Sequence, residues 1–250
     1  MSEITEGHIV RRFDGDLAKL HQKILEMGGL AADQVSRAVH AVIQGDREAL
    51  AQVVSRDHLI NESETGADAM VARLFAQRQP MGIDLRVVLA FSKVITELER
   101  AGDEAKRIAE LGIQLYSPRA GANARALLCD VTNMGELASN LMRLSLEALD
   151  HLDAEAAANV ILAHRRLDAE FQSCFRRLAT YIMEDSRNVG DSVNVLLVTK
   201  SLERIGDNAN HMAAHTIYMV EGKDVRHLSV EEMDRKLAEG PATISSPGTR

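Results

Sequence analysis

The chain has 250 residues, of which 46% are hydrophobic but only 3% aromatic, and its formal net charge is −8. This acidic balance argues against general nucleic-acid binding, because it offers no basic field to meet phosphates. The sequence has no apolar run as long as a membrane span and opens with no signal peptide. We therefore expect a cytosolic protein that reaches a membrane only through partners. Cys129 and Cys174 are isolated, and we expect reduced thiols.

Three long helical patterns fill the first half of the chain. The first runs from about Asp16 to Gln44 and ends at Gly45, a C-terminal cap signal. Asp46 is predicted to cap the second, which runs to about Gln77.

The third pattern runs from about Asp84 to Tyr116, and we expect Asp84 to cap it. Its small and apolar positions step by three and four residues, which is typical of an antiparallel helical bundle. These positions are Val88, Phe91, Ile95, Leu98, Gly102, Ala105 and Ala109. Residues 10–116 are thus predicted to form one three-helix unit, and residues 117–121 a linker.

The second half repeats this plan over residues 122–222. Its helices are predicted at about 123–150, 153–185 and 191–221, and the last ends at Gly222. We expect Asp153 and Asp191 to act as N-caps.

The tail is predicted at residues 223–250. Ser229 and Glu232 have capping-box spacing before a short C-terminal helix that reaches about Glu239. The last ten residues are predicted to be disordered.

A repeat relates the two halves. The phrase LERAGDEAKRIA at 98–109 returns as LERIGDNANHMA at 202–213, offset by 104 residues. The chain is therefore predicted to be all-α, with two tandem, sequence-related three-helix bundles built from six long helices. Gly102 and Gly206 fall in the core-facing seam, so a neighbouring helix should approach closely at each.

The same phrase places one carboxylate pair in each half, Glu99 with Asp103 and Glu203 with Asp207. A spacing of four puts both side chains of a pair on one helix face, at the border of the buried stripe. Paired carboxylates suit hard cations such as magnesium, manganese or iron, with waters or another helix completing the shell. The bland alternative is a solvated helix face with Glu–Arg pairs, which the recurrence disfavours.

An enzyme is the main alternative class. The di-iron carboxylate bundle needs a Glu-x-x-His signature, and no Glu here has a His three residues later. No nucleophile or base constellation stands out either, so we predict no catalytic residues and no enzyme. A metal-dependent hydrolase or oxidoreductase on these carboxylates is the runner-up hypothesis. A third hypothesis is a scaffold whose carboxylates contact only water and arginine.

At these motifs the sequence resembles the PhoU family of phosphate-signalling accessory proteins. The twin motifs LERAGD and LERIGD match the family's repeated E(D)xxxD signature, and the resemblance extends from about Phe13 to Leu237. Further matching stretches are EMGGL at 26–30, RQPMGIDLR at 78–86, YIMEDSR at 181–187 and GKDVRH at 222–227.

The resemblance implies two three-helix bundles with metal ions or a cluster at Glu99, Asp103, Glu203 and Asp207. It leaves the metal open between iron, manganese and magnesium. It implies a negative regulator of phosphate uptake and signalling that acts when phosphate is plentiful. The implied partners are the ATPase subunit of the phosphate ABC transporter, a sensor histidine kinase and a second copy in a homodimer.

Other polar residues receive weaker interpretations. Asp33 stands one position beyond the family's acidic residue in the first helix, so a first-helix ligand is in doubt. We expect Glu136 and Asn140 to be surface residues. Asn61 and Glu64 match a family pattern, and we expect them to make helix–helix hydrogen bonds. His211 continues the row after Asp207 but drifts away from the seam, which makes it a minor ligand candidate.

Overall fold

The computed structural model of the chain describes residues 11–116, 124–184, 189–226, 228, 232, 233 and 235. Over these residues the fold is all-α, as predicted. The helices of the first half are α2 (Arg11–Gln44), α3 (Arg47–Arg56), α4 (His58–Arg78) and α5 (Ile83–Leu115). Those of the second half are α6 (Ala124–His151), α7 (Ala154–Glu184) and α8 (Val189–Glu221).

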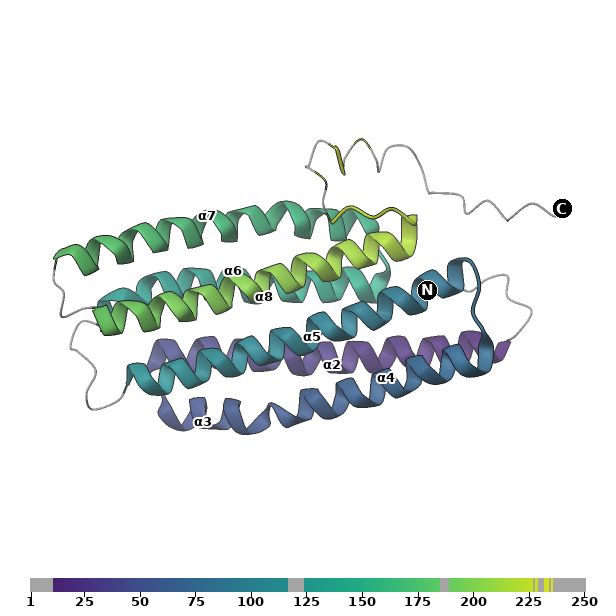
Figure 1. Ribbon diagram of the computed structural model, residues 1–250, viewed down its shortest axis with the longest axis horizontal. Coiled ribbons are helices and arrows are strands. Elements are labelled where there is room, and N and C mark those ends of the chain that lie inside the picture. Colours follow the sequence, from purple (N-terminus) through teal and green to yellow (C-terminus); the bar gives the residue numbers. More distant parts are fainter. Residues whose placement is uncertain are drawn as a thin grey trace.

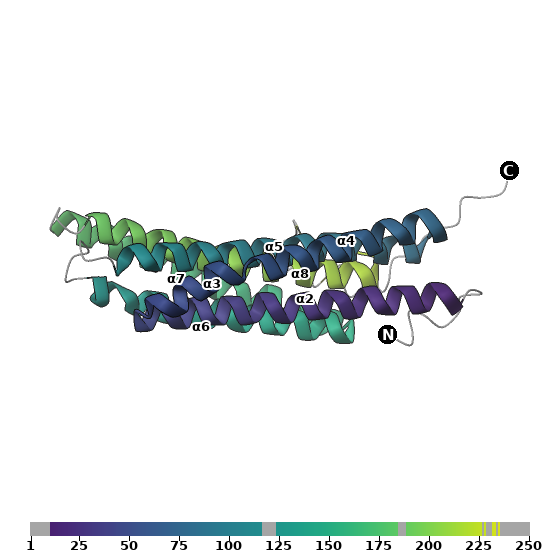
Figure 2. The same cartoon turned by 90° about the horizontal axis from the view of Figure 1, so that it is seen from below.

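The helices lie nearly parallel to one another in an elongated molecule (Figure 1). Seen from below, α7, α8, α5 and α4 form one layer, and α6 and α2 form a second (Figure 2). The halves meet where α5 packs against α8 and α2 against α6. The α4–α5 turn lies at one end of the molecule and the end of α7 lies at the other (Figure 1).

Several predicted helix boundaries are confirmed by their hydrogen bonds and dihedral angles. The Asp46 carboxylate accepts from the backbone N–H groups of Glu48 and Ala49, and Asp153 accepts from that of Ala156 at 2.9 Å. Such side-chain acceptors satisfy donors that a helix start leaves unpaired. Gly45 and Gly222 have φ angles of 71° and 72°, the left-handed conformation that ends a helix.

The prediction of one continuous second helix was wrong, because this segment is divided at Asp57 into α3 and α4. No proline or glycine marks the break; Asp57 keeps helical dihedral angles. Its side chain is only 6% exposed and pairs with Lys106 of α5 at 2.9 Å. Asn61 also donates to this carboxylate, at 3.4 Å. The break therefore accompanies a buried ion pair between helices.

The predicted caps of the third helices were also wrong. Helix α5 begins at Ile83, so Asp84 lies in its first turn, and the N-cap position is Gly82, which makes no side-chain cap bond. Asp191 likewise lies in the first turn of α8.

Residues 232, 233 and 235 are helical, in keeping with a short C-terminal helix. The linker at 117–121, the side chain of Cys129, Ser229 and the end of the tail lie outside the described residues. Cys174 is buried, and its thiol donates to Oγ1 of Thr199 at 3.9 Å.

The seam of each third helix is buried as predicted. A Cβ on Gly102 would lie 2.6 Å from the Ile60 side chain of α4, and one on Gly206 would overlap the Leu167 side chain of α7. Because glycine has no side chain, α4 can approach α5 closely at Gly102, and α7 can approach α8 closely at Gly206. This close approach positions side chains of α4 and α7 beside the twin motifs.

Candidate metal centre

The four predicted carboxylates lie on α5 and α8, at the border between core and surface. Glu99, Glu203 and Asp207 are half-buried and Asp103 is exposed. Their neighbours Leu98, Gly102, Leu202 and Gly206 are buried in the seam. The helical-wheel position inferred from sequence is therefore confirmed.

In the first half, α4 brings two further carboxylates to the motif. Burial and the charges of Asp103 and Glu64 raise the pKa of Glu99 from 4.5 to about 7. Burial and the charges of Asp68 and Asp103 also raise the pKa of Glu64. Glu64, Asp68, Glu99 and Asp103 thus form what we call the first cluster. Like charges held together at partial burial destabilise one another, and a cation relieves that repulsion.

The first cluster suits a hard cation on chemical grounds. Its donors are all carboxylate oxygens, the ligands that magnesium and manganese prefer. Nearby Lys106 is already paired with Asp57, and Arg100 contacts Glu97 at 3.5 Å. These two basic side chains are therefore already engaged with carboxylates outside the first cluster.

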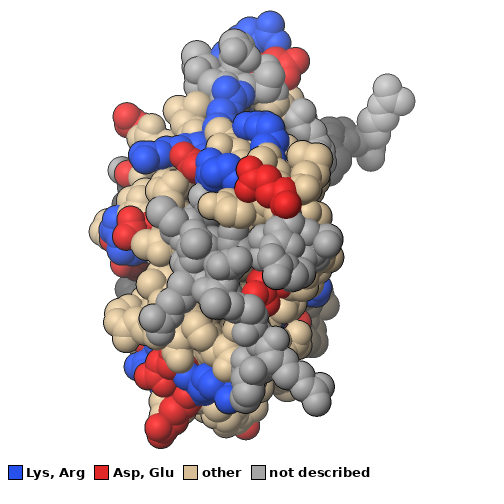
Figure 3. All heavy atoms as spheres, turned by 90° about the vertical axis from the view of Figure 1, so that its left-hand side faces the viewer, with Lys and Arg blue, Asp and Glu red and all other residues tan. Residues whose placement is uncertain are grey.

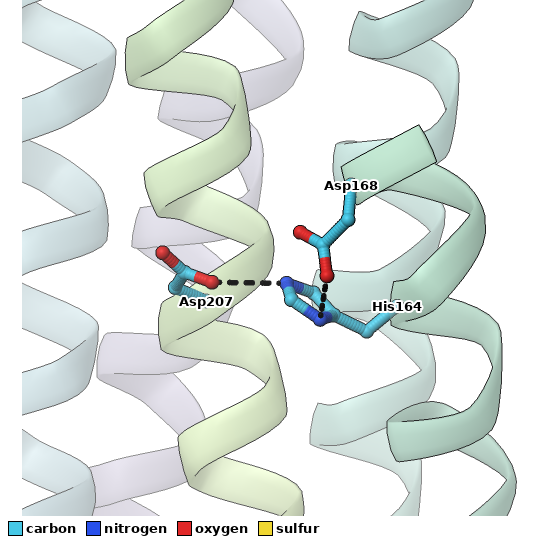
Figure 4. A group of neighbouring side chains, drawn as sticks. All are labelled: His164, Asp168 and Asp207. Atoms are coloured by element: carbon cyan, nitrogen blue, oxygen red, sulfur yellow. Dashed lines mark ion pairs between the residues drawn. The ribbon is translucent and has the colours of Figure 1, made fainter. Parts of the chain in front are cut away.

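In the second half, a buried histidine of α7 joins the motif. His164 Nε2 lies 3.0 Å from Oδ1 of Asp207, and Nδ1 lies 3.4 Å from Oδ2 of Asp168 (Figure 4). The three side chains offer ligand atoms that all lie within 4.8 Å of one another. Burial opposes the charged imidazole, but the carboxylates of Asp207, Asp168 and Glu203 outweigh it and raise the pKa of His164. We call His164, Asp168, Asp207 and Glu203 the second cluster.

A lysine distinguishes the second cluster from the first. Lys200 forms a short ion pair with Glu203, one turn along α8. Its ammonium group also lies 5.1 Å from the centre of the Phe171 ring, within reach of a cation–π contact. Glu203 therefore has a cationic partner within the protein.

The glycine contacts give the equivalences between the second helices. Ile60 faces Gly102, and Leu167 faces Gly206. Equivalent positions of α4 and α7 near these glycines therefore differ by 107 in residue number. His164 and Asp168 thus stand where the first half has Asp57 and Asn61. By the same offset, Phe171 and Phe175 stand where the first half has Glu64 and Asp68.

A surface pocket joins the two clusters across the α5–α8 contact. Asp103 and Asp207 both line it, from opposite sides of the interface. Arg204 donates to Glu104 at 2.9 Å, and His211 Nδ1 lies 3.4 Å from Oε2 of Glu97. Both pairs cross between the halves. His211 thus faces α5, and its hydrogen-bonded contact with Glu97 raises its pKa.

Sequence reasoning missed the contribution of the second helices. Glu64 and Asp68 belong to the first cluster, whereas Glu64 was expected only to make helix–helix hydrogen bonds. Asn61 donates to Asp57, at the break between α3 and α4. His164 and Asp168 were not singled out, although their spacing of four places both on one helix face. Asp33 instead pairs with Arg37 and Arg56. Glu136 and Asn140 are exposed, as expected.

These features define a class of protein: a duplicated three-helix bundle with a polar cluster between the second and third helices of each half. The sequence profile of the PhoU domain matches residues 24–112 and again residues 131–216. The chain belongs to the PhoU family.

Relatives and solved structures agree with this assignment. The chain is 38% identical to the "phosphate-specific transport system accessory protein PhoU homolog" of Pseudomonas putida, covering 90% of this chain and 87% of that protein. It is 32% identical to the PhoU accessory protein of Escherichia coli, covering 92% and 94%. A crystal structure of PhoU from Pseudomonas aeruginosa matches with a TM-score of 0.80 at 35% identity, covering 84% of this chain and 100% of that one.

The family assignment answers the question of enzymatic activity. These relatives are named as accessory proteins of a transport system, and the chain is a regulatory accessory protein rather than an enzyme. Within the part of the chain that the structure describes, no helix is long and apolar enough to cross a membrane.

Proposed function

We propose that the protein is a cytosolic negative regulator of phosphate uptake and phosphate-regulon signalling. Membership of the PhoU family carries this proposal, together with relatives named after the phosphate-specific transport system. As an adaptor it contacts the ATPase subunit of the phosphate ABC transporter and the sensor histidine kinase. It acts as a homodimer and restrains both partners when phosphate is plentiful.

The twin motifs are proposed to bind metal ions through Glu99, Asp103, Glu203 and Asp207. The first cluster supports this, because burial and the like charges of Asp103 and Glu64 raise the pKa of Glu99. Glu64 and Asp68 come from α4 and Glu99 and Asp103 from α5. Through a shared cation, these side chains would hold α4 against α5 and fix the surface around the motif.

In the second cluster, Glu203 reaches a cation only when Lys200 moves aside. The Lys200 side chain is 41% exposed, so solvent can receive its ammonium group. For the carboxylates of the twin motifs, the proposed metals are magnesium, manganese or iron.

The double variant Asp103→Ala with Asp207→Ala tests the proposal. Both side chains lie at the rim of the core, so helical content measured by circular dichroism should stay near that of the parent. Metal content after purification should fall, and cells should express phosphate-starvation genes despite ample phosphate. A control variant, Glu110→Ala with Asp150→Ala, removes two exposed carboxylates outside both clusters.

The two readouts separate the parts of the proposal. Normal signalling after loss of metal would make the metal structural or incidental. Failed signalling with unchanged metal would make these carboxylates partner contacts. Capture of the tagged protein from phosphate-rich and phosphate-starved cells then tests the partners. If neither the transporter ATPase nor the kinase is retained in phosphate-rich cells, the adaptor role is wrong.

A further inference from the structure

The imidazole of His164 lies between two carboxylates with one ring nitrogen toward each (Figure 4). Residue His164 is only 7% exposed, and the chain could have placed an apolar side chain there. Its Nε2 atom is fully buried and finds no aligned hydrogen-bond partner among the described residues. Yet Oδ1 of Asp207 is 3.0 Å away. The two atoms form an ion pair that is poorly aligned for a hydrogen bond, and the same placement suits two ligand atoms of one metal ion.

The spacing of the converging atoms fits a metal ion. Zinc-type ions bind imidazole nitrogen and carboxylate oxygen at about 2.0–2.2 Å, so two neighbouring ligands lie about 3.0 Å apart in octahedral and about 3.4 Å apart in tetrahedral geometry. The contact between Nε2 and Asp207 lies at the short end of this range. On the far side of the ring, Asp168 faces Nδ1 at 3.4 Å. A carboxylate at that nitrogen fixes the tautomer and ring direction of a metal-bound histidine.

The donor set also separates this cluster from its counterpart. The first cluster offers only carboxylate oxygens, whereas the second offers an imidazole nitrogen, which suits zinc, iron and other transition metals. The two clusters also differ in their net negative charge. Four carboxylates meet in the first cluster. In the second cluster Lys200 neutralises Glu203, which leaves the two charges of Asp168 and Asp207, enough for one divalent ion.

We propose that the second half binds a single transition-metal ion of the zinc class through His164 Nε2 and Asp207, with Asp168 as a positioning residue. This site is separate from the metal proposed above for the first half. This inference deepens the proposed function and rests on its metal-binding part.

Calorimetric titration of the full chain, stripped with chelator, tests the proposal with Zn²⁺ and Mn²⁺ as separate probes. His164→Gln should weaken the tightest Zn²⁺ site by at least about 100-fold and leave Mn²⁺ binding at the first cluster unchanged. Asp168→Asn should weaken Zn²⁺ by about 10-fold, the usual range for a group that orients a ligand. The matched control is His211→Gln, a half-exposed histidine of α8 that faces Glu97, which should leave the Zn²⁺ site unchanged.

A spectroscopic measurement covers the case in which His164→Gln does not fold. X-ray absorption of the parent protein with one equivalent of Zn²⁺ should show one imidazole in the shell, and the same shell should appear in His211→Gln. Asp168→Asn, an exposed position, should keep that imidazole but bind more weakly. A shell of oxygen atoms alone would overturn the proposal.

Other outcomes separate this inference from the proposed function. Equal Zn²⁺ affinity in the parent and in folded His164→Gln means an adventitious ion only, and the inference fails. If Mn²⁺ binding at the first cluster persists in that case, the metal part of the proposed function survives. If the parent binds neither ion, both metal claims fail. Loss of Zn²⁺ without any change in phosphate signalling supports the inference and removes its regulatory meaning.

Discussion

The two halves carry the same motif on their third helices but surround it with different second helices. Around Glu99 and Asp103, α4 adds the acids Glu64 and Asp68. Around Asp207, α7 adds a buried histidine. At the positions of α7 equivalent to Glu64 and Asp68, the second half has Phe171 and Phe175. The motif thus sets the place of each cluster, and the second helix sets its charge and donor atoms.

A difference in backbone accompanies the difference in chemistry. In the first half the helix breaks at Asp57, whose buried carboxylate is held by Lys106. In the second half the equivalent residue is His164, and α7 continues through it without a break. The carboxylate of Asp57 pairs with a lysine of α5, whereas the imidazole of His164 contacts Asp207 of the motif on α8. Two copies of one unit have therefore diverged on the second helix.

Separate single variants should have the largest effect on this comparison. Asp103→Asn should abolish binding at the first cluster alone, and Asp207→Asn at the second alone, because each contributes a charge to one cluster. Titration of each variant with Mn²⁺ and Zn²⁺ checks this. The distinction is needed because Asp103 and Asp207 line one surface pocket. If either change removes all binding, a single ion is shared across that pocket and the halves do not act separately.

The glycine seams offer the next largest effect. Gly102→Leu should overpack the contact with Ile60 and lower the free energy of unfolding by on the order of 1–3 kcal/mol. Gly206→Leu should cost a similar amount, but its Cβ would also lie 3.4 Å from Cδ2 of His164. Only Gly206→Leu should therefore disturb metal binding at the second cluster. Denaturant unfolding measures the first effect, and titration with Zn²⁺ the second.

An unchanged melting temperature in Gly102→Leu would mean that α4 does not approach α5 as closely as the structure places it. Equal loss of Zn²⁺ binding in both glycine variants would break the comparison, because the Gly102 seam does not touch His164.

Much of this fold could be predicted because its signals are local. Asp46 and Asp153 are capping residues next to apolar periodic runs, and the glycines Gly45 and Gly222 end helices in the conformation that glycine favours. The repeated motif fixed the places of the carboxylates on α5 and α8, because their face follows from helical spacing alone.

The second-helix partners could not be placed in the same way. Which face of α4 or α7 meets the motif depends on the register between two helices, which the spacing within one helix does not contain. A signal did exist: Asp57, Asn61, Glu64 and Asp68 step by four, three and four residues along one face. The break at Asp57 left no such signal, since the ion pair that accompanies it is formed with Lys106, 49 residues away.

Removal of the second cluster's own cation should have an intermediate effect. Thr96 is the first-half equivalent of Lys200, so Lys200→Thr removes the ion pair with Glu203 and places the first-half residue at this position. With its ion pair gone, Glu203 becomes a free ligand, and Mn²⁺ affinity at the second cluster should rise by about 10-fold, since affinity follows the number of charged ligands. The control is Lys19→Thr, at an exposed lysine of α2 outside the second cluster. No gain in Mn²⁺ affinity would mean that Lys200 does not compete with the metal.

The smallest effect concerns stability against pH in metal-free buffer. The folded-state pKa of Glu99 is raised from 4.5 to about 7, so the folded protein binds a proton more readily than the unfolded chain. The stabilising contribution is therefore complete below about pH 4.5 and is lost as pH rises toward 7. Glu99→Gln removes this dependence, because the amide stays neutral.

At pH 8 without metal, Glu99→Gln should be more stable than the parent, by about 1 kcal/mol after allowance for solvent screening of a half-buried group. At pH 4 the two should unfold alike. Glu203→Gln should do the reverse at pH 8 and lose up to about 1 kcal/mol, because it gives up the ion pair with Lys200. Urea unfolding at both pH values, repeated with Mn²⁺, measures these differences. Added Mn²⁺ should favour the parent over Glu99→Gln, since the ion binds the carboxylate and not the amide. If both variants change stability with the same sign, the two glutamates have equivalent surroundings, and the contrast between a crowded and a neutralised cluster is wrong.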